Sequence, residues 1–412
     1  MFPSRPSTNL FTCTTTNKVV LPCDRPLRVK DVENTLQFLF DSLDKNEERW
    51  QEMNSTWDID NIEIKHLKNE NGLLPNGYRV IVKFHSIDKP YCVLLKVRNS
   101  EIIKVNETKE NDSIESQEFF KPFIQLHERE VKFYNEIAPW VSLPIPMVYY
   151  SQIWDISDGK EGIIVQEDLI REAVKQDVYN GLTIEQVESV LKYLAEFHAA
   201  IICNSNIDEI LSHFAPLPYR CVNFNEKKLI DDLNKVNING EELRRFIINE
   251  SNNISTDRRR KTLKRTVLVH GNLWSANVKF KKSLLGKACT ELRGILNWQH
   301  CHEGSPLEDV ASLIVTSTNS AIRKENLNRF LYLYYEQLRM NLKIQDKKIP
   351  YSLNEIHTMY NEEYSSQVYF LLLSHISFII SPIFADKATE NQKEILLNRL
   401  RDAFEEIRLN YS

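Results

Sequence analysis

Glycine is scarce in this sequence. Only 10 of its 412 residues are glycine, well below the usual share of about 7%. A loop that covers the phosphates of a nucleotide closely needs several glycines, because side chains would keep the backbone away. The segment before Tyr78, ENGLLPNGY, offers only Gly72 and Gly77. A tight glycine-rich cradle for a triphosphate is therefore not expected.

Cysteines are few, and they follow no pattern. Seven are spread along the chain without a C-x-x-C or any spacing typical of a metal site, and their number is odd. This favours a reducing compartment over a disulfide scaffold. The N-terminus lacks the charged and then apolar order of a signal peptide, so we expect a cytoplasmic protein.

Positive charge and long apolar runs are also limited. The net charge is -5, and the basic run at 258–265 is interpreted as a solvated loop, so no nucleic-acid partner is expected. The one segment that suggests a membrane helix, Val368 to Phe384, contains His375, serines and Pro382. It is interpreted as a buried core helix, and no membrane span is expected.

Length and composition suit two lobes. With 412 residues and 42% hydrophobic content, the chain can bury a large core. We expect a flexible N-terminal arm over residues 1–28, an N-lobe over 29–165 that binds nucleotide phosphates, and a C-lobe over 166–412 that carries the catalytic loop and the substrate side. The arm leads into a helix from about Val29 to Met53.

An antiparallel hairpin is predicted from Tyr78 to Val97, because two apolar runs flank a turn-like segment at 86–90. Lys96 lies near the end of its second strand, in V-L-L-K-V. In a kinase-like lobe, such a lysine holds the α- and β-phosphates of the nucleotide and pairs with a helix glutamate. Lysines at strand ends are common, however, and alone this one is a weak signal.

The partner for Lys96 is sought in the next predicted helix, from about Glu115 to Ile137. Val131, Tyr134 and Ile137 share one face of it, and Glu130 lies beside them at helical spacing. Glu130 is therefore predicted to face Lys96. The alternative is that Glu130, like Glu128, is a surface charge.

A linker between the lobes is predicted at Gly162–Leu169, where an apolar strand ends in the polar residues Gln166 and Glu167. Its backbone could bind the edge of an adenine, although any edge strand leading to a loop would look similar. The capping box Thr183-x-x-Gln186 then opens an amphipathic helix. His198, at the end of its apolar face, is interpreted as a packed core histidine.

The stretch from Val267 to Asp309 carries the chemistry. Kinase-type enzymes have a catalytic loop H-x-D-L-x-x-x-N, and a later Asp at the tip of a strand holds magnesium. His270, Asn272, Leu273 and Asn277 fill the same frame, and Asn297 follows an apolar strand where the second Asp would be. The alternative is an ordinary pair of strands with asparagines in the turns.

Two amides thus replace two carboxylates. An amide at Asn272 can orient an alcohol but cannot take up its proton, and general-base help is typically worth about 10²–10⁴ in rate. Asn297 and Asn277 would offer magnesium two neutral oxygens, whereas this hard cation prefers anionic ones. The swaps are isosteric, so the fold should survive while catalysis is lost or slowed.

These motifs resemble the CHK-kinase-like family, also called ecdysteroid-kinase-like, which is related to choline kinases and aminoglycoside phosphotransferases. That family shows H-G-D-L-W-x-x-N and I-D-W-Q-x-x-x-x-G-x-P-x-x-D-L. This chain has H-G-N-L-W-S-A-N from His270, and I-L-N-W-Q from Ile295, followed by Gly304, Pro306 and Asp309. The resemblance extends over most of the chain from about residue 60.

The resemblance implies an α+β, two-lobe, protein-kinase-like fold: a small antiparallel sheet with one main helix, and a larger, mostly helical lobe. It implies ATP and Mg²⁺ as cofactors and transfer to a small hydroxylated molecule. Asn272 with His270 would be the catalytic positions and Asn277 with Asn297 the metal positions. The cofactor-binding residues would be Lys96, Glu130, Gln166 and Glu167.

Two functions from different classes follow. One is a pseudokinase whose pocket binds a nucleotide, a lipophilic small molecule or a protein partner without turnover. The other is an active ATP-dependent kinase for a steroid-like or choline-like hydroxyl, with Asp168, Glu303 or Glu308 as substitute carboxylate. Asp309, which is retained, is expected to anchor the loop backbone from a helix start.

Overall fold

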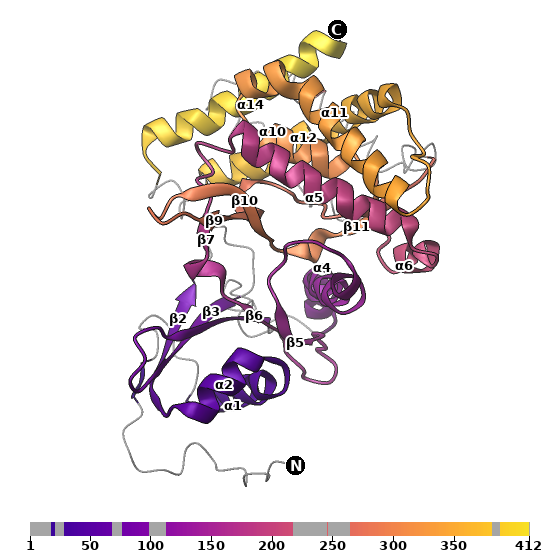
Figure 1. The fold of residues 1–412 in the computed structure, drawn as a ribbon. Helices are drawn as coiled ribbons and strands as arrows, with labels where there is room; N and C mark the ends of the chain where they lie inside the picture. The colour runs from indigo at the N-terminus through magenta and orange to yellow at the C-terminus, as the bar shows by residue number, and fades with distance from the viewer. Residues whose placement is uncertain are drawn as a thin grey trace.

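The computed structural model describes residues 18–20, 29–67, 76–98, 113–216, 245, 264–380 and 388–411. Strands gather in an N-terminal lobe and long helices in a C-terminal lobe (Figure 1). The predicted α+β two-lobe fold is confirmed. The glycine-poor loop before Tyr78 and the N-terminal arm lie largely outside the described residues. The lobe boundaries at 28 and 165 stay predictions.

The N-terminal lobe is built on a six-stranded sheet with the order β1-β2-β3-β4-β6-β5. Its pairs are antiparallel, except that β1 runs parallel to β2. The predicted hairpin is the β3–β4 pair, and Lys96 lies opposite Gly77 in its register. The strands are β1 Lys18–Val20, β2 Ile59–Leu67, β3 Asn76–Phe84, β4 Tyr91–Arg98, β5 Val148–Gln152 and β6 Gly162–Glu167.

One face of this sheet is covered by the helices α1 (Val29–Asn46) and α2 (Glu48–Thr56). Val93, Leu95 and Val97 of β4 are buried in the core beneath these helices, together with Trp50. Because side chains alternate along a strand, the residues between them face the other side of the sheet. This alternation turns Lys96 away from the N-terminal core.

The single helix expected from Val29 to Met53 is two helices, α1 Val29–Asn46 and α2 Glu48–Thr56. The break lies at Glu47, whose carboxylate accepts the Trp50 N–H and so caps α2. The Tyr91 hydroxyl donates to the same carboxylate at 2.9 Å. A contact with a distant strand therefore fixes the break.

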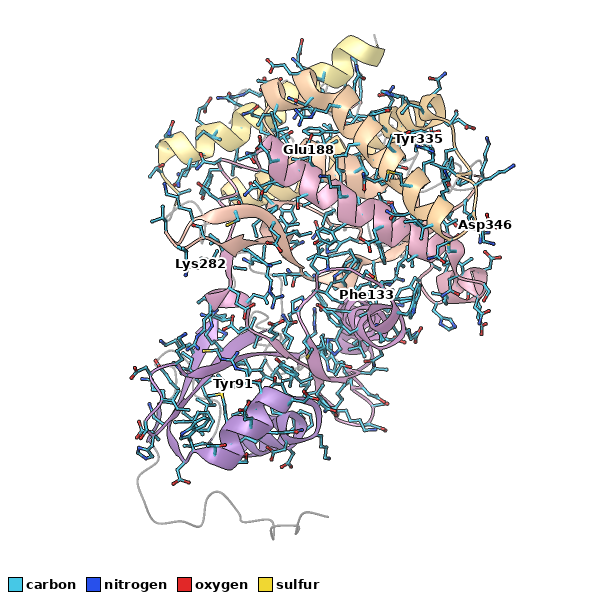
Figure 2. The ribbon with its side chains drawn as sticks, in the orientation of Figure 1. Tyr91, Phe133, Glu188, Lys282, Tyr335 and Asp346 are labelled. Carbon is cyan, nitrogen blue, oxygen red and sulfur yellow. The ribbon has the colours of Figure 1, made fainter. Side chains whose placement is uncertain are left out.

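On the other side of the sheet, α4 Ser113–Lys132 continues into a short π-helix, Phe133–Ile137. Arg129 of α4 is buried and donates to the carbonyls of Cys301 (2.8 Å) and Ala215 (2.6 Å) in the C-terminal lobe. Phe133 stacks on Trp298 with ring centroids 3.8 Å apart. Figure 2 shows Phe133 where α4 meets the upper lobe. This helix therefore joins the two lobes.

The C-terminal lobe packs its helices around α5, which opens with the predicted capping box at Thr183 and Gln186. His198, on α5, is fully buried and bonds the Tyr334 hydroxyl at 2.7 Å, as expected of a core histidine. The helices are α5 Ile184–Cys203, α6 Ile207–Ser212, α10 Glu308–Ser317, α11 Ser320–Ile344, α12 Leu353–Ile380 and α14 Glu390–Tyr411.

Two small sheets lie between these helices and the N-terminal lobe (Figure 1). One has the order β10-β9-β7 and the other pairs β11 with β8. The catalytic-type loop follows β8, and Asn297 follows β10. The strands are β7 Ala173–Lys175, β8 Val267–Val269, β9 Val278–Lys282, β10 Ala288–Ile295 and β11 His302–Gly304.

The core helix expected from Val368 does not begin at that residue. It is the second half of one continuous helix, α12, which begins at Leu353 and runs to Ile380. No glycine or proline interrupts Leu353–Ile380, so the change from polar to apolar residues does not end the helix. Val368 is fully buried. Among the described residues, we find no helix with both the length and the apolar character needed to cross a membrane.

Candidate functional site

Lys96 and Glu130 meet as predicted. The Lys96 Nζ lies 2.7 Å from Glu130 Oε1, and the two side chains are 15% and 1% exposed. Burial alone would raise the pKa of the Glu130 carboxyl. The charge and hydrogen bond of Lys96, with the charge of Arg98, outweigh burial and hold this pKa below its ordinary value. Glu130 is therefore an anion at neutral pH.

The predicted asparagines connect to this ion pair. Lys96 Nζ donates to Asn297 Oδ1 (3.2 Å), and Asn297 Nδ2 donates to Asn277 Oδ1 (2.8 Å). Asn277 Nδ2 in turn donates to the Asn272 carbonyl (2.8 Å). One hydrogen-bonded chain therefore runs from Glu130 to Asn272 and joins both lobes.

Asn297 has a left-handed backbone, with φ 66° and ψ 58°. Asn and Asp tolerate this region better than other side chains apart from glycine. The left-handed backbone at this position therefore restricts the residue type, and it tolerates Asn as well as Asp. An Asp at this position would keep the same turn.

Asp309 anchors the backbone of the catalytic-type loop that begins at His270. Its carboxylate accepts the backbone N–H of His270 (2.6 Å) and of Gly271 (3.0 Å). It is fully buried in the first turn of α10. This is the anchoring role expected for Asp309.

His270 is buried, and both of its ring nitrogens bond to the backbone. Nε2–H donates to the Leu296 carbonyl (2.8 Å), and Nδ1 accepts the Asn272 N–H (3.2 Å). Burial lowers the pKa of His270 to about 4, so the ring is neutral at pH 7. Its contacts orient the loop beneath Asn272.

Gln166 and Glu167 take no part in the hydrogen bonds of the asparagine chain. Gln166 is buried, and its Oε1 has no hydrogen-bond partner among the described residues. Glu167 binds Arg293 at 2.5 Å, and its backbone N–H donates to the Met147 carbonyl at 2.8 Å. The backbone donor expected to be free for an adenine is therefore engaged at Glu167.

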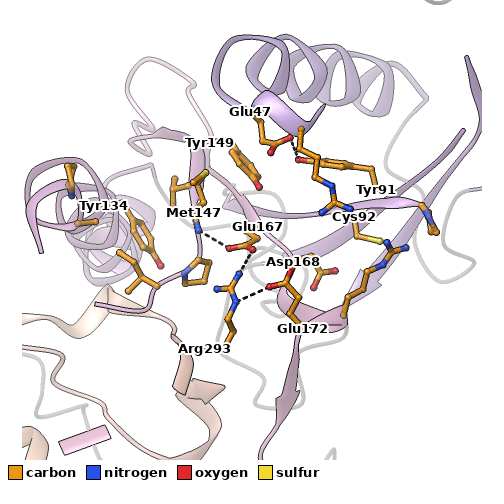
Figure 3. Close-up of a pocket in the computed structure, with 18 residues that line it drawn as sticks. Glu47, Tyr91, Cys92, Tyr134, Met147, Tyr149, Glu167, Asp168, Glu172 and Arg293 are labelled. Carbon is orange, nitrogen blue, oxygen red and sulfur yellow. Dashed lines mark hydrogen bonds and ion pairs between the residues drawn. The ribbon is translucent and has the colours of Figure 1, made fainter. Parts of the chain in front are cut away.

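Glu167 lines a pocket of about 670 Å³ beside the linker. Figure 3 shows Arg293 between Glu167 and Glu172, with Tyr91 and Tyr149 nearby. None of Lys96, Asn272, Asn277 and Asn297 lines this pocket. It is therefore a hollow on the linker side, separate from the asparagine chain.

The three carboxylates considered as substitutes each have another partner. Asp168 pairs with Arg79 and caps the Ile170 N–H. Glu303 accepts the Thr266 hydroxyl at 2.7 Å, and Glu308 lies 3.2 Å from the His302 ring. None of these contacts involves the catalytic-type loop.

Sequence reasoning missed Arg98. It is buried, donates to Gln299 Oε1 at 2.7 Å and acts on the Glu130 carboxyl. The available signal was its position two residues after Lys96, on the same face of β4. Lys96 and Arg98 carry two positive charges against the single negative charge of Glu130, and the asparagines add none. The cluster therefore favours an anionic ligand.

Magnesium does not fit the donors at the predicted metal position. The Asn277 oxygen already accepts the Asn297 amide, and the Asn297 oxygen accepts from Lys96. A cation there would meet two neutral oxygens beside an ammonium group. Within the described ranges, no group of three His, Cys, Asp or Glu side chains is placed to hold a metal ion.

Comparison with known proteins gives a family and remote fold relatives. Residues 59–411 match the DUF1679 family, described as uncharacterized oxidoreductase dhs-27. One curated relative is the uncharacterized oxidoreductase dhs-27 of Caenorhabditis elegans, which is 25% identical over 357 residues covering 81% of this chain. The chain spans 41% of the length of that protein.

Similar solved structures include choline kinase LicA from Streptococcus pneumoniae. It has 12% identity and a TM-score of 0.45, and the match covers 90% of this chain and 99% of that one. Another is the GDP complex of an aminoglycoside 2'-phosphotransferase, with 12% identity and a TM-score of 0.45, covering 85% and 93%. At these values the likeness is remote.

Proposed function

The chain belongs to the DUF1679 family, and we propose that it is a CHK-kinase-like pseudokinase of the small-molecule phosphotransferase class. In this proposal it binds a phosphorylated ligand at Lys96 without the metal chemistry of phosphate transfer. The hydrogen bond from Asn297 Nδ2 to Asn277 Oδ1 carries the proposal. In this bond the two side-chain amides satisfy each other. A kinase has a carboxylate and an amide oxygen at these two positions, and both are ligands of magnesium.

The Lys96–Glu130 pair supports phosphate binding. The glutamate holds the ammonium in place at 2.7 Å, and Lys96 keeps 15% of its side chain exposed for a ligand. Arg98 adds a second positive charge nearby. An ATP-like ligand could therefore bind by its phosphates without a bridging cation.

The Asn272 position supports the absence of turnover. In a kinase, a carboxylate there accepts the proton of the attacking hydroxyl. The Asn272 amide cannot take up a proton, and the neighbouring His270 has both ring nitrogens bonded to backbone groups. The carboxylates of Asp168, Glu303 and Glu308 are engaged elsewhere, which weighs against an active kinase.

The word oxidoreductase in the relative's name describes a protein of which this chain spans 41%. The dinucleotide fingerprint of such enzymes needs G-x-G at a strand-to-helix turn. No two of the 10 glycines in this chain are spaced as G-x-G. The residues of this chain therefore support phosphate binding at Lys96 better than a dinucleotide site of that kind.

The natural ligand is proposed only by class: a small hydroxylated or lipophilic molecule, or a protein partner, beside the nucleotide. A cytoplasmic location is proposed with it, because a reducing compartment keeps thiols free. The described cysteines Cys92, Cys203, Cys289 and Cys301 are free thiols.

Restoring both carboxylates tests this function. Wild type and the Asn272→Asp/Asn297→Asp variant are compared for phosphate release from ATP in the presence of Mg²⁺. We expect turnover only in the restored variant, by a factor of at least about 10². Equal turnover in the two proteins would refute the pseudokinase assignment and favour an active kinase.

A further inference from the structure

Two leucines stand in solvent at the tip of the β9–β10 hairpin. Leu284 is 108% and Leu285 87% exposed, and no other large apolar side chain among the described residues is as exposed. The hairpin projects from the small sheet at the edge of the molecule (Figure 1). Burial in this fold therefore does not account for either side chain.

The turn that presents them is well formed. The Gly286 N–H donates to the Ser283 carbonyl (2.9 Å), and the Ser283 N–H donates to the Lys287 carbonyl (2.8 Å). The Lys287 N–H also donates to Ser283 Oγ (3.1 Å). Gly286 has φ 77°, the left-handed conformation that closes this kind of hairpin loop. The leucines thus occupy the two central positions of a fixed turn.

Those central positions normally carry Gly, Pro, Asn, Asp or Ser, because such residues suit the backbone of a turn. Leucine gains nothing there from folding. The preference for turn-forming residues is thus violated at these positions without a gain in stability, and such violations usually mark a functional site. The pair is therefore best explained by something outside this chain that covers it.

The flanking residues indicate what covers it. Lys281, Lys282 and Lys287 surround the leucines and are exposed, and no acidic residue occurs from Val278 to Thr290. Figure 2 shows Lys282 at the outer edge of the hairpin. Lys281 pairs with Glu291 farther down the strand. The tip of the hairpin thus has two exposed leucines surrounded by positively charged lysines.

We propose that this tip docks the protein on an anionic membrane surface. The leucines enter the boundary between headgroups and acyl chains, and the lysines contact the negative headgroups. A protein partner would need a patch of roughly 800 Å² for a stable interface, and a narrow turn with two side chains offers much less. A bilayer accepts a narrow wedge without a matching pocket. This inference does not depend on the pseudokinase assignment.

Vesicle sedimentation tests the proposal with the full chain at low salt. We expect binding to phosphatidylcholine vesicles containing about 30% phosphatidylserine, and little binding to pure phosphatidylcholine. Leu284→Ser/Leu285→Ser should weaken binding by at least about 100-fold, from the apolar area that no longer enters the bilayer. Lys282→Ser/Lys287→Ser should weaken it by about 25-fold, at roughly fivefold per lysine.

The matched control is Ile344→Ser. It removes another exposed apolar side chain, at 76% exposure on α11, and should leave vesicle binding unchanged. Circular dichroism checks that all variants fold. The proposal is overturned if wild type stays in the supernatant with anionic vesicles, or if the leucine variant binds them equally. Leucine-dependent self-association without lipid, seen by sedimentation velocity, would also overturn it and assign the tip to a second copy.

Discussion

The two halves of the candidate site differ in charge. The half from the N-terminal lobe keeps a buried ion pair, Lys96 with Glu130. The half from the C-terminal lobe presents only the amides of Asn272, Asn277 and Asn297. Asn297 bonds to Lys96 and to Asn277, and Asn277 donates to the backbone carbonyl of Asn272. The half proposed to anchor phosphate thus keeps its charges, while the half at the predicted metal position is neutral. The geometry of such a site can persist after the charges that would support catalysis are replaced.

Removing the positive charge of Lys96 should have the largest effect on stability and on ATP binding. Lys96→Met leaves the carboxylate of Glu130 buried without its cation, which should cost about 3–5 kcal/mol of unfolding free energy. Urea denaturation measures this, and calorimetry should show that ATP binding is lost. In Lys96→Met/Glu130→Gln the stranded carboxylate is gone, and only the Arg98 guanidinium, which is bonded to Gln299, loses its anion; part of the stability should therefore return while ATP binding stays absent. A double variant as unstable as the single one would contradict the ion-pair account.

Acid should weaken the fold through His270. Its folded pKa is about 4, below the unfolded value of about 6.5. The stability that depends on the neutral ring is therefore complete above pH 6.5 and is lost as pH falls toward 4. The slope from this residue is at most about 1.4 kcal/mol per pH unit.

Urea denaturation between pH 7 and 4.5 measures that slope. His270→Gln should be less stable at pH 7 but should lose stability less steeply on acidification. Parallel pH profiles of the two proteins would show that His270 does not titrate as described.

Asp309, whose carboxylate anchors the loop, should contribute more to the free energy of unfolding than the amide of Asn272. Asp309→Asn replaces an acceptor of two backbone N–H groups with one that presents an NH₂ group to one of them. We expect a loss of about 2–3 kcal/mol. The matched comparison is Asn272→Ala. Asn272 is exposed and lies at the end of the hydrogen-bonded chain of asparagines, so this substitution should lower the free energy of unfolding by less than about 1 kcal/mol. Equal losses by urea denaturation would contradict this ranking.

The contact between the lobes should give the smallest effect. Phe133→Leu keeps an apolar side chain but removes the parallel stack on Trp298. We expect a loss of about 1 kcal/mol. ATP affinity, measured by calorimetry, should fall only slightly, because the Lys96–Glu130 pair remains. A loss as large as that of Lys96→Met would mean that the stack, and not the ion pair, holds the two halves together.

Much of the site could be predicted from local pattern. Lys96 follows from an apolar strand, and Glu130 from its place beside the buried face of a helix. The asparagines follow from spacing within a loop. In each case, the residues that decide the position are close in the sequence.

Other features depend on contacts between distant segments, which no local pattern contains. Glu47 breaks the first helix because Tyr91, 44 residues later, holds its carboxylate. Glu167 lines the separate pocket and binds Arg293, which lies 126 residues away in the sequence. The bond of Arg98 to Gln299 joins residues 201 positions apart, although the place of Arg98 on the Lys96 face of its strand was a local signal.

The dependence of ATP affinity on magnesium tests the central claim most directly. Isothermal titration of wild type with ATP, in Mg²⁺ and in EDTA, should give affinities within about twofold of each other. In Asn297→Asp, which restores one anionic oxygen at the metal position, Mg²⁺ should raise the affinity at least about tenfold. Strong Mg²⁺-dependent binding of ATP by wild type would contradict the claim that this half of the site has lost its charge.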